Sequence, residues 1–139
     1  MSSVPLPTDA APLLPHRPPM AMIEKLLANE DGRRLTAFTV RPDNRFLNGD
    51  GVLDSTVIPE LVAQTAAAAD THRNGGQIRP GFLALARGIR ILRPLRVHDE
   101  VIITAADESP MEGWFVITFS MALVDGTPCA NGEISVCRI

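Results

Sequence analysis

The chain has 139 residues, of which 45% are apolar and 21% charged, and its formal net charge is −3. These values are typical of one globular domain that can bury a sizeable core. Apolar runs stay well below the roughly 20 residues of a membrane-spanning helix, and the N-terminus lacks the cationic start and apolar block of a secretory signal. We therefore expect a cytoplasmic protein with no membrane partner.

Two further features of the composition limit the function. The acidic balance, the single tryptophan and the absence of tyrosine argue against a nucleic-acid partner. Cys129 and Cys137 are too few and too far apart for a metal site or a disulfide framework, so we expect buried thiols on one strand. We expect neither a metal nor another cofactor.

The chain begins with a segment rich in proline and alanine. Residues 1–12 are expected to form a flexible arm, ordered only where something packs on them, and residues 13–139 the folded domain. A first strand is predicted over Met20–Ala28, with a hairpin partner over Arg33–Val40. The alternation in the partner strand predicts that its apolar side chains share one face; these are Leu35, Ala37 and Val40.

An irregular loop over Pro42–Leu53 leads to the one convincing helix, Val57–His72. Apolar residues recur there at steps of three and four, which is the spacing of one helical stripe, and its alanines give it high propensity and a thin profile. Pro59 fits the first turn if the helix begins near Ile58, but would kink a helix capped by Asp54.

The rest of the chain is predicted as strands rich in Val, Ile, Phe and Thr, separated by turns. The predicted strands are Phe82–Leu92, Glu100–Ala106, Trp114–Val124 and Cys129–Arg138. One hairpin, one helix and a long meander make an α+β plan and not an alternating parallel one.

This order of elements resembles the hot-dog fold, an antiparallel β-sheet wrapped around one central α-helix. Local strings are similar to motifs of bacterial 3-hydroxyacyl-acyl carrier protein dehydratases. These strings are Leu14–Met20 (the family's LPHRxP), Phe46–Asp50 (FFxGH), Glu60–Gln64 (ExxAQ), Pro80–Leu83, Leu92–Leu95 and His98–Asp99. The resemblance implies an acyl thioester substrate on acyl carrier protein or coenzyme A, and a homodimer or a heterodimer with another hot-dog protein.

The loop before the helix departs from the family's pattern. Where the family has its catalytic histidine this chain has Asp50, and the loop is shorter. A branch of hot-dog proteins from aryl-polyene gene clusters has a similarly shortened loop, and some of its members are thought to be partners of a competent dehydratase subunit. Three hypotheses follow: a dehydratase-like enzyme, a non-catalytic acyl-binding partner subunit, and a hot-dog thioesterase.

Dehydration of a 3-hydroxyacyl thioester needs a base for the α-proton, an acid for the departing hydroxyl and donors for the thioester carbonyl. By resemblance Glu60 is the catalytic carboxylate; without the resemblance it would only complement the helix dipole. Asp50 is the candidate base in place of the histidine, or else a turn residue. Gln64 is expected to hold Glu60 or a substrate oxygen, or to be tied to the backbone. Asp54 is expected to cap the helix.

Other candidates are weaker. Gly49 and Gly51 of the loop and Phe82 of the following strand are candidates for substrate contact. The histidines are expected to be structural or solvated; they are His16, His72 and His98. The six arginines between positions 73 and 96 stand without Asp or Glu among them, and we expect either a solvated strand face or a surface for an acidic carrier protein or a phosphate. The proposed docking residues are Arg79, Arg87, Arg90 and Arg93.

Overall fold

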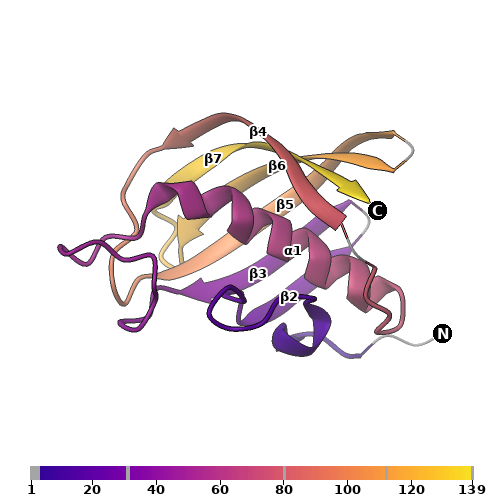
Figure 1. Ribbon diagram of the computed structural model, residues 1–139, viewed down its shortest axis with the longest axis horizontal. Helices are drawn as coiled ribbons and strands as arrows, with labels where there is room; N and C mark the ends of the chain where they lie inside the picture. The colour runs from indigo at the N-terminus through magenta and orange to yellow at the C-terminus, as the bar shows by residue number, and fades with distance from the viewer. Residues whose placement is uncertain (1–3, 31, 80, 112, 139) are drawn as a thin grey trace.

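The computed structural model describes residues 4–30, 32–79, 81–111 and 113–138. Seven strands form one antiparallel sheet in the order β1-β2-β3-β5-β6-β7-β4, and the long helix α1 (Ile58–Arg73) lies across one face of it. Figure 1 shows α1 running diagonally over the sheet, with β4 curving over it at one edge. This is the hot-dog architecture, and the predicted fold class is confirmed.

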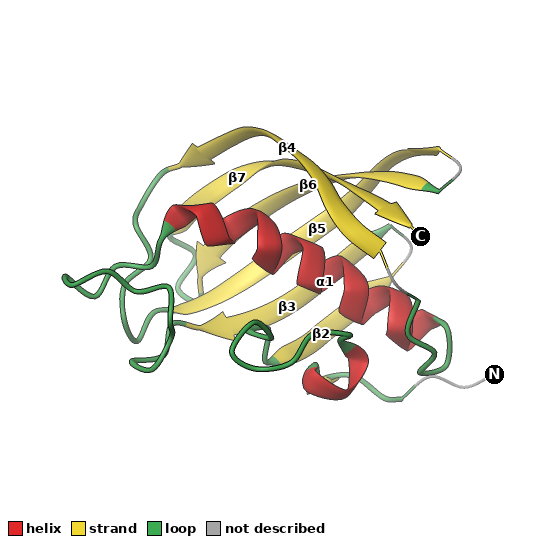
Figure 2. Cartoon of the chain, in the orientation of Figure 1, coloured by secondary structure: helices red, strands yellow, loops and turns green. Residues whose placement is uncertain are grey.

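The elements follow the predicted order, with small additions (Figure 2). The strands are β1 (Thr8–Asp9), β2 (Lys25–Glu30), β3 (Arg33–Thr39), β4 (Gly81–Ile91), β5 (Glu100–Met111), β6 (Trp114–Leu123) and β7 (Pro128–Arg138). Two short 3-10 helices, η1 (Ala11–Leu13) and η2 (Ser55–Val57), were not predicted. Among the described residues, no helix has both the length and the apolar character that crossing a bilayer requires.

Two strand boundaries differ from the prediction. The first long strand begins at Lys25 and not at Met20, because the N–H groups of Met22 and Ile23 are directed at the side chain of Gln64 on α1. Strand β5 continues past Ala106 to Met111, where a turn was expected. Its register with β6 shifts near this end, between Glu108 and Met111.

The buried side chains in and just after β3 do not follow the predicted apolar set, of which Val40 alone is buried. Buried positions alternate at Arg34, Thr36, Phe38 and Val40, whereas Leu35 and Ala37 are only half-buried. Two polar side chains therefore face α1. They are accommodated because each has a partner: the hydroxyls of Thr36 and Thr65 lie 2.8 Å apart, and Arg34 pairs with Asp107.

The described part of the N-terminal segment packs against the domain. Strand β1 pairs with β2, and the Ala10 side chain is fully buried. The Nε2 atom of His72, near the end of α1, lies 2.7 Å from the carbonyl oxygen of Val4. The N-terminal arm was expected to be ordered only where it packs against other residues, and its described part does pack. The domain boundary at residue 13 stays a prediction.

The start of α1 agrees with the reading of its sequence. The α-helix begins at Ile58, so Pro59 lies in the first turn, where its missing N–H costs nothing. Asp54 caps the preceding 3-10 turn and accepts hydrogen bonds from the backbone N–H (3.0 Å) and hydroxyl (2.8 Å) of Thr56. These bonds hold the pKa of Asp54 below its ordinary value. Asp54 thus caps the 3-10 turn that leads into α1, whereas the N-cap of α1 itself is Val57 without a side-chain hydrogen bond, and Glu60 lies in the first turn of the helix.

The main core lies between α1 and strands β3, β5, β6 and β7. Its largest fully buried side chains include Phe38, Leu61, Ile103 and Met121. Both cysteines lie on β7 as free thiols; Cys129 is buried, which raises its pKa, and Cys137 is half-buried. The core holds one face of α1 against the sheet and leaves another face half-open beside β4.

Candidate functional site

A cavity of about 410 Å³ lies between α1, β4 and the ends of β3, β5 and β6. One half-buried face of α1 forms its longest wall, with residues at steps of three and four: Glu60, Ala63, Ala66, Ala67, Asp70 and Arg73. The alanines leave the volume that larger side chains would fill. Apolar side chains of the strands complete the wall; these are Phe82, Leu83, Phe115, Ile117 and Val136. The result is a slot whose middle is lined by alanines and other apolar side chains and whose ends carry charged groups.

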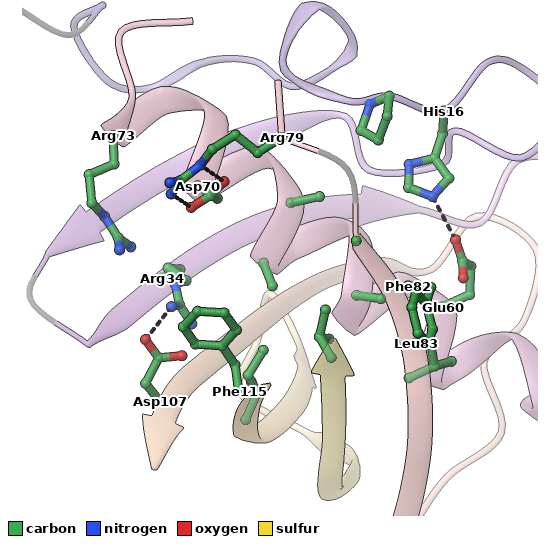
Figure 3. Close-up of a pocket in the computed structure, with 17 residues that line it drawn as sticks. His16, Arg34, Glu60, Asp70, Arg73, Arg79, Phe82, Leu83, Asp107 and Phe115 are labelled. Atoms are coloured by element: carbon green, nitrogen blue, oxygen red, sulfur yellow. Dashed lines mark hydrogen bonds and ion pairs between the residues drawn. The ribbon is translucent and has the colours of Figure 1, made fainter. Parts of the chain in front are cut away.

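Glu60 stands at one end of this cavity (Figure 3). Its Oε1 atom lies 3.0 Å from Nε2 of His16, which comes from the segment before β2, and both side chains are 26% exposed. The side-chain amide of Gln64 also donates to the same oxygen, at 3.3 Å. Two nitrogen atoms therefore contact the same carboxylate oxygen, and both belong to the same chain as Glu60.

Gln64 is fully buried and connects α1 to the segment Met20–Ile23. Its Oε1 accepts hydrogen bonds from the N–H groups of Met22 (2.9 Å) and Ile23 (3.4 Å), and its Nε2 donates to the carbonyl of Met20 (2.5 Å). The sequence left open whether Gln64 binds the backbone, Glu60 or a substrate oxygen. In the structure it binds both the backbone and Glu60. A direct contact of Gln64 with substrate stays a prediction.

The opposite end of the cavity carries an ion pair that sequence reasoning missed. Nη2 of Arg34 lies 2.5 Å from Oδ2 of Asp107, and the Arg34 side chain is only 6% exposed. Among the described residues, Nε and Nη1 of Arg34 and Oδ1 of Asp107 have no hydrogen-bond partner. Figure 3 shows this pair well separated from His16 and Glu60, with Arg73 and Arg79 on the same side of the slot.

The loop residues proposed from the sequence lie elsewhere. Asp50 and Gly49 are exposed, and the N–H of Asp50 donates to the Asn48 side chain at 2.9 Å, which is a turn contact. Gly51 has a φ of 74°, and a Cβ there would be 3.4 Å from Val97. Among the described residues, none of these three lines the cavity that holds Glu60. Their roles stay predictions, which would need the loop of a second subunit.

The arginines divide into two kinds. Arg79 pairs with Asp70 (2.7 Å) and Arg93 with Asp99 (2.7 Å), so both already have a carboxylate partner. Arg87 and Arg90 lie exposed on β4; the Arg87 guanidinium reaches Glu133 only at 3.9 Å. Phe82, also on β4, is 51% exposed and lines the cavity.

Sequence reasoning did not single out for chemistry four of the titratable residues that line the cavity: His16, Arg34, Asp70 and Asp107. His16 was noted within the Leu14–Met20 string but was expected to be structural, and Arg34 was expected to face outward. The described residues contain no group of three His, Cys, Asp or Glu side chains that could hold a metal ion. The site combines a carboxylate and an imidazole at one end of a slot lined by alanines in its middle.

Comparisons with known proteins identify the family of the chain. The family model described as "ApeP-like: ApeP dehydratase" matches residues 8–139. The 3-hydroxyacyl-[acyl-carrier-protein] dehydratase FabZ of Listeria welshimeri is 27% identical over 127 residues, covering 88% of each chain. Because the family model spans nearly the whole chain, the match applies to the complete domain.

Solved structures share the fold. A chain of the dehydratase heterocomplex ApeI:P from Xenorhabdus doucetiae superposes with a TM-score of 0.86 at 21% identity, over 98% of this chain and 93% of that one. A hypothetical thioesterase from Streptococcus pneumoniae with coenzyme A superposes less closely, with a TM-score of 0.65 at 14% identity, over 82% and 84% of the two chains. The fold thus serves both classes of protein, and the family match separates them: this chain is a dehydratase-like hot-dog protein and belongs to the ApeP-like family.

Proposed function

We propose that the chain dehydrates 3-hydroxyacyl thioesters and that Glu60 is its catalytic carboxylate. The observation that carries this proposal is the position of Glu60 at one end of a cavity of about 410 Å³ whose wall includes the alanine face of α1. Removal of the α-proton requires a base beside the thioester, and an apolar slot beyond that base accepts the acyl chain. Glu60 meets the first requirement and the alanine face of α1 the second.

The cavity has the shape of an acyl-chain site. Glu60 and Asp70 line the same face of α1 ten residues apart, and ten helical residues rise about 15 Å. Ala63, Ala66 and Ala67 lie between them along the helix. A chain bound along this face would keep its thioester end near Glu60 and bury its apolar carbons against the alanines and Phe115.

The edge strand β4 is the proposed dimer interface. Among the described strands it pairs with β7 alone, and it leaves Phe82, Leu85 and Ile91 between 43% and 51% exposed. A long, apolar, unpaired edge is normally covered in a native protein. A second subunit on this edge would also adjoin the cavity, because Phe82 belongs to both. In such a dimer, the loop of the second subunit would bring the aspartate that corresponds to Asp50 close to Glu60.

The proposed carrier of the substrate is an acyl carrier protein or coenzyme A. Arg87 and Arg90 present positive charge on the exposed face of β4, where Arg87 has only a distant contact with Glu133 (3.9 Å), and this suits an acidic protein surface or a phosphate. Arg79 and Arg93 would first have to exchange their present partners, Asp70 and Asp99.

A non-catalytic partner subunit is the second candidate function. It is favoured by one observation: the loop position that resembles the family's catalytic histidine is an aspartate, Asp50. In that role the chain would complete the acyl slot of a second hot-dog subunit.

The test is turnover of a short 2-enoyl thioester and its 3-hydroxy counterpart by the purified chain, followed through the absorbance of the conjugated enoyl thioester, with thiol release measured in parallel. Reversible hydration that is lost in Glu60→Gln and retained in the matched exposed control Glu30→Gln supports the dehydratase. Thiol release would replace it with a thioesterase. No reaction in either channel from a folded protein would leave the partner subunit as the function.

A further inference from the structure

The contact between His16 and Glu60 joins two segments far apart in the sequence at the reacting end of the cavity. His16 Nε2 lies 3.0 Å from Glu60 Oε1, and both residues line the cavity. Of the chain's histidines, all of which fall within the described residues, His72 and His98 do not line it. Figure 3 shows the His16 ring directed at the Glu60 carboxylate. His16 is therefore the imidazole that this chain itself brings to its carboxylate.

The segment that carries His16 is held in place on both sides. Leu14, two residues before it, is 1% exposed and packs in a cluster with Leu26, Ala68 and Ala69. On the other side, Gln64 binds the backbone of Met20, as well as that of Met22 and Ile23. Because Gln64 belongs to the same helix as Glu60, the imidazole and the carboxylate are positioned by one rigid unit.

The surroundings of the imidazole assign its proton. Nδ1 of His16 is buried and, among the described residues, has no hydrogen-bond partner. A proton on Nδ1 would be a buried donor without an acceptor, which costs more than leaving the nitrogen unprotonated. We therefore assign the proton to Nε2, which donates it to Glu60.

The two oxygens of Glu60 are in different environments. Oε1 receives the His16 imidazole and, at 3.3 Å, the Gln64 amide. Within the part of the chain that the structure describes, no hydrogen bond reaches Oε2. The two contacts at Oε1 fix the orientation of the Glu60 carboxylate, and Oε2 is then available to a bound substrate.

We propose that His16 is a positioning residue that fixes Glu60 through Oε1 so that Oε2 acts on the substrate. This inference rests on the proposed dehydratase function. Oε2 takes the α-proton, and the C–H electron pair becomes the C2–C3 double bond. The same carboxylic acid then gives that proton to the 3-hydroxyl group, and the C–O bond breaks with its electrons on oxygen, so that water leaves. Glu60 returns to a carboxylate, and His16 keeps its own proton throughout.

The experiment compares His16→Leu and His16→Gln in the full chain with a 3-hydroxyacyl thioester as the substrate. The glutamine amide replaces the ring N–H, whereas leucine removes it. We expect kcat to fall about 10–100-fold in His16→Leu with KM within about twofold, since a misdirected catalytic group loses transition-state stabilisation. His16→Gln should recover most of the loss, and the exposed turn control His98→Asn should match the wild type.

An unchanged kcat in His16→Leu, or no recovery in His16→Gln with both variants folded, overturns the positioning role and leaves the dehydratase function standing. Absence of turnover in the wild type overturns both. A second measurement is independent of turnover: the ring ¹⁵N signals of His16 in NMR should show the Nε2–H tautomer and should move in Glu60→Gln. An Nδ1–H tautomer, or signals indifferent to Glu60→Gln, overturns the contact itself.

Discussion

Gln64 lies one helical turn after Glu60, and its side-chain Nε2 donates to Glu60 Oε1 at 3.3 Å. The same side-chain amide also binds three backbone groups of the segment Met20–Ile23. One buried residue thus joins the carboxylate, the helix and the segment that follows His16. Loss of this side chain should affect the stability of the fold as well as the direction of Glu60.

Replacement of Gln64 by leucine should lower the free energy of unfolding by about 2–4 kcal/mol, because the Met22 N–H and the Met20 carbonyl would be left buried without partners. Urea denaturation measures this loss. Gln77→Leu, at an exposed position after α1, is the matched control and should change stability little. A Gln64→Leu variant as stable as that control would show that the backbone groups find other partners.

The Arg34–Asp107 pair should behave as a buried ion pair. Arg34→Met alone leaves the Asp107 carboxylate without its partner, and Asp107→Leu alone leaves a guanidinium whose side chain is 6% exposed. Asp107→Leu is expected to cost about 3–5 kcal/mol, and Arg34→Met less, because Asp107 is 23% exposed and water can solvate its carboxylate. The double variant should lose less than the sum, since no unpaired charge remains. A double-mutant cycle from denaturant unfolding tests this. Additive losses would mean that the two side chains do not stabilise each other.

Gly132 on β7 is required by the close approach of β4. A Cβ at this position would lie 2.7 Å from Cδ1 and 3.0 Å from Cα of Ile89, so an alanine would push backbone as well as side chain. We expect Gly132→Ala to cost about 1–3 kcal/mol, as overpacking does in cores. Thermal or urea unfolding gives the comparison with Gly49→Ala, where nothing lies within 4 Å. Equal stability of the two variants would refute the steric argument.

The β4 edge should control self-association. Leu85 on this strand is 43% exposed. Because each subunit contributes the same residue to a two-fold interface, Leu85→Lys would place two lysines there. We expect Leu85→Lys to weaken dimerisation by about tenfold or more, equivalent to about 1.4 kcal/mol, measured by sedimentation equilibrium. Val124→Lys, at a position that is 63% exposed outside β4, should leave the mass unchanged. If Leu85→Lys keeps the association of the wild type, β4 is not the interface.

Local features could be predicted because they depend on neighbours in the chain. The helix start at Ile58 follows from Pro59, and the 3-10 turn before it from the Asp54 cap, since each acts within one turn. The order of the strands and their apolar character likewise follow from residue type and spacing. Glu60 could be identified through its resemblance to a family motif, because that motif lies within one helical turn.

Only the tertiary structure decided which groups meet. The sequence placed Leu35 and Ala37 of β3 inward, but the fold turns Arg34 and Thr36 toward α1, because Asp107 and Thr65 arrive from distant segments to satisfy them. The same holds for His16, whose approach to Glu60 depends on Gln64 holding the segment Met20–Ile23. A polar side chain can face the core when a remote partner compensates its burial, and no local pattern records that partner.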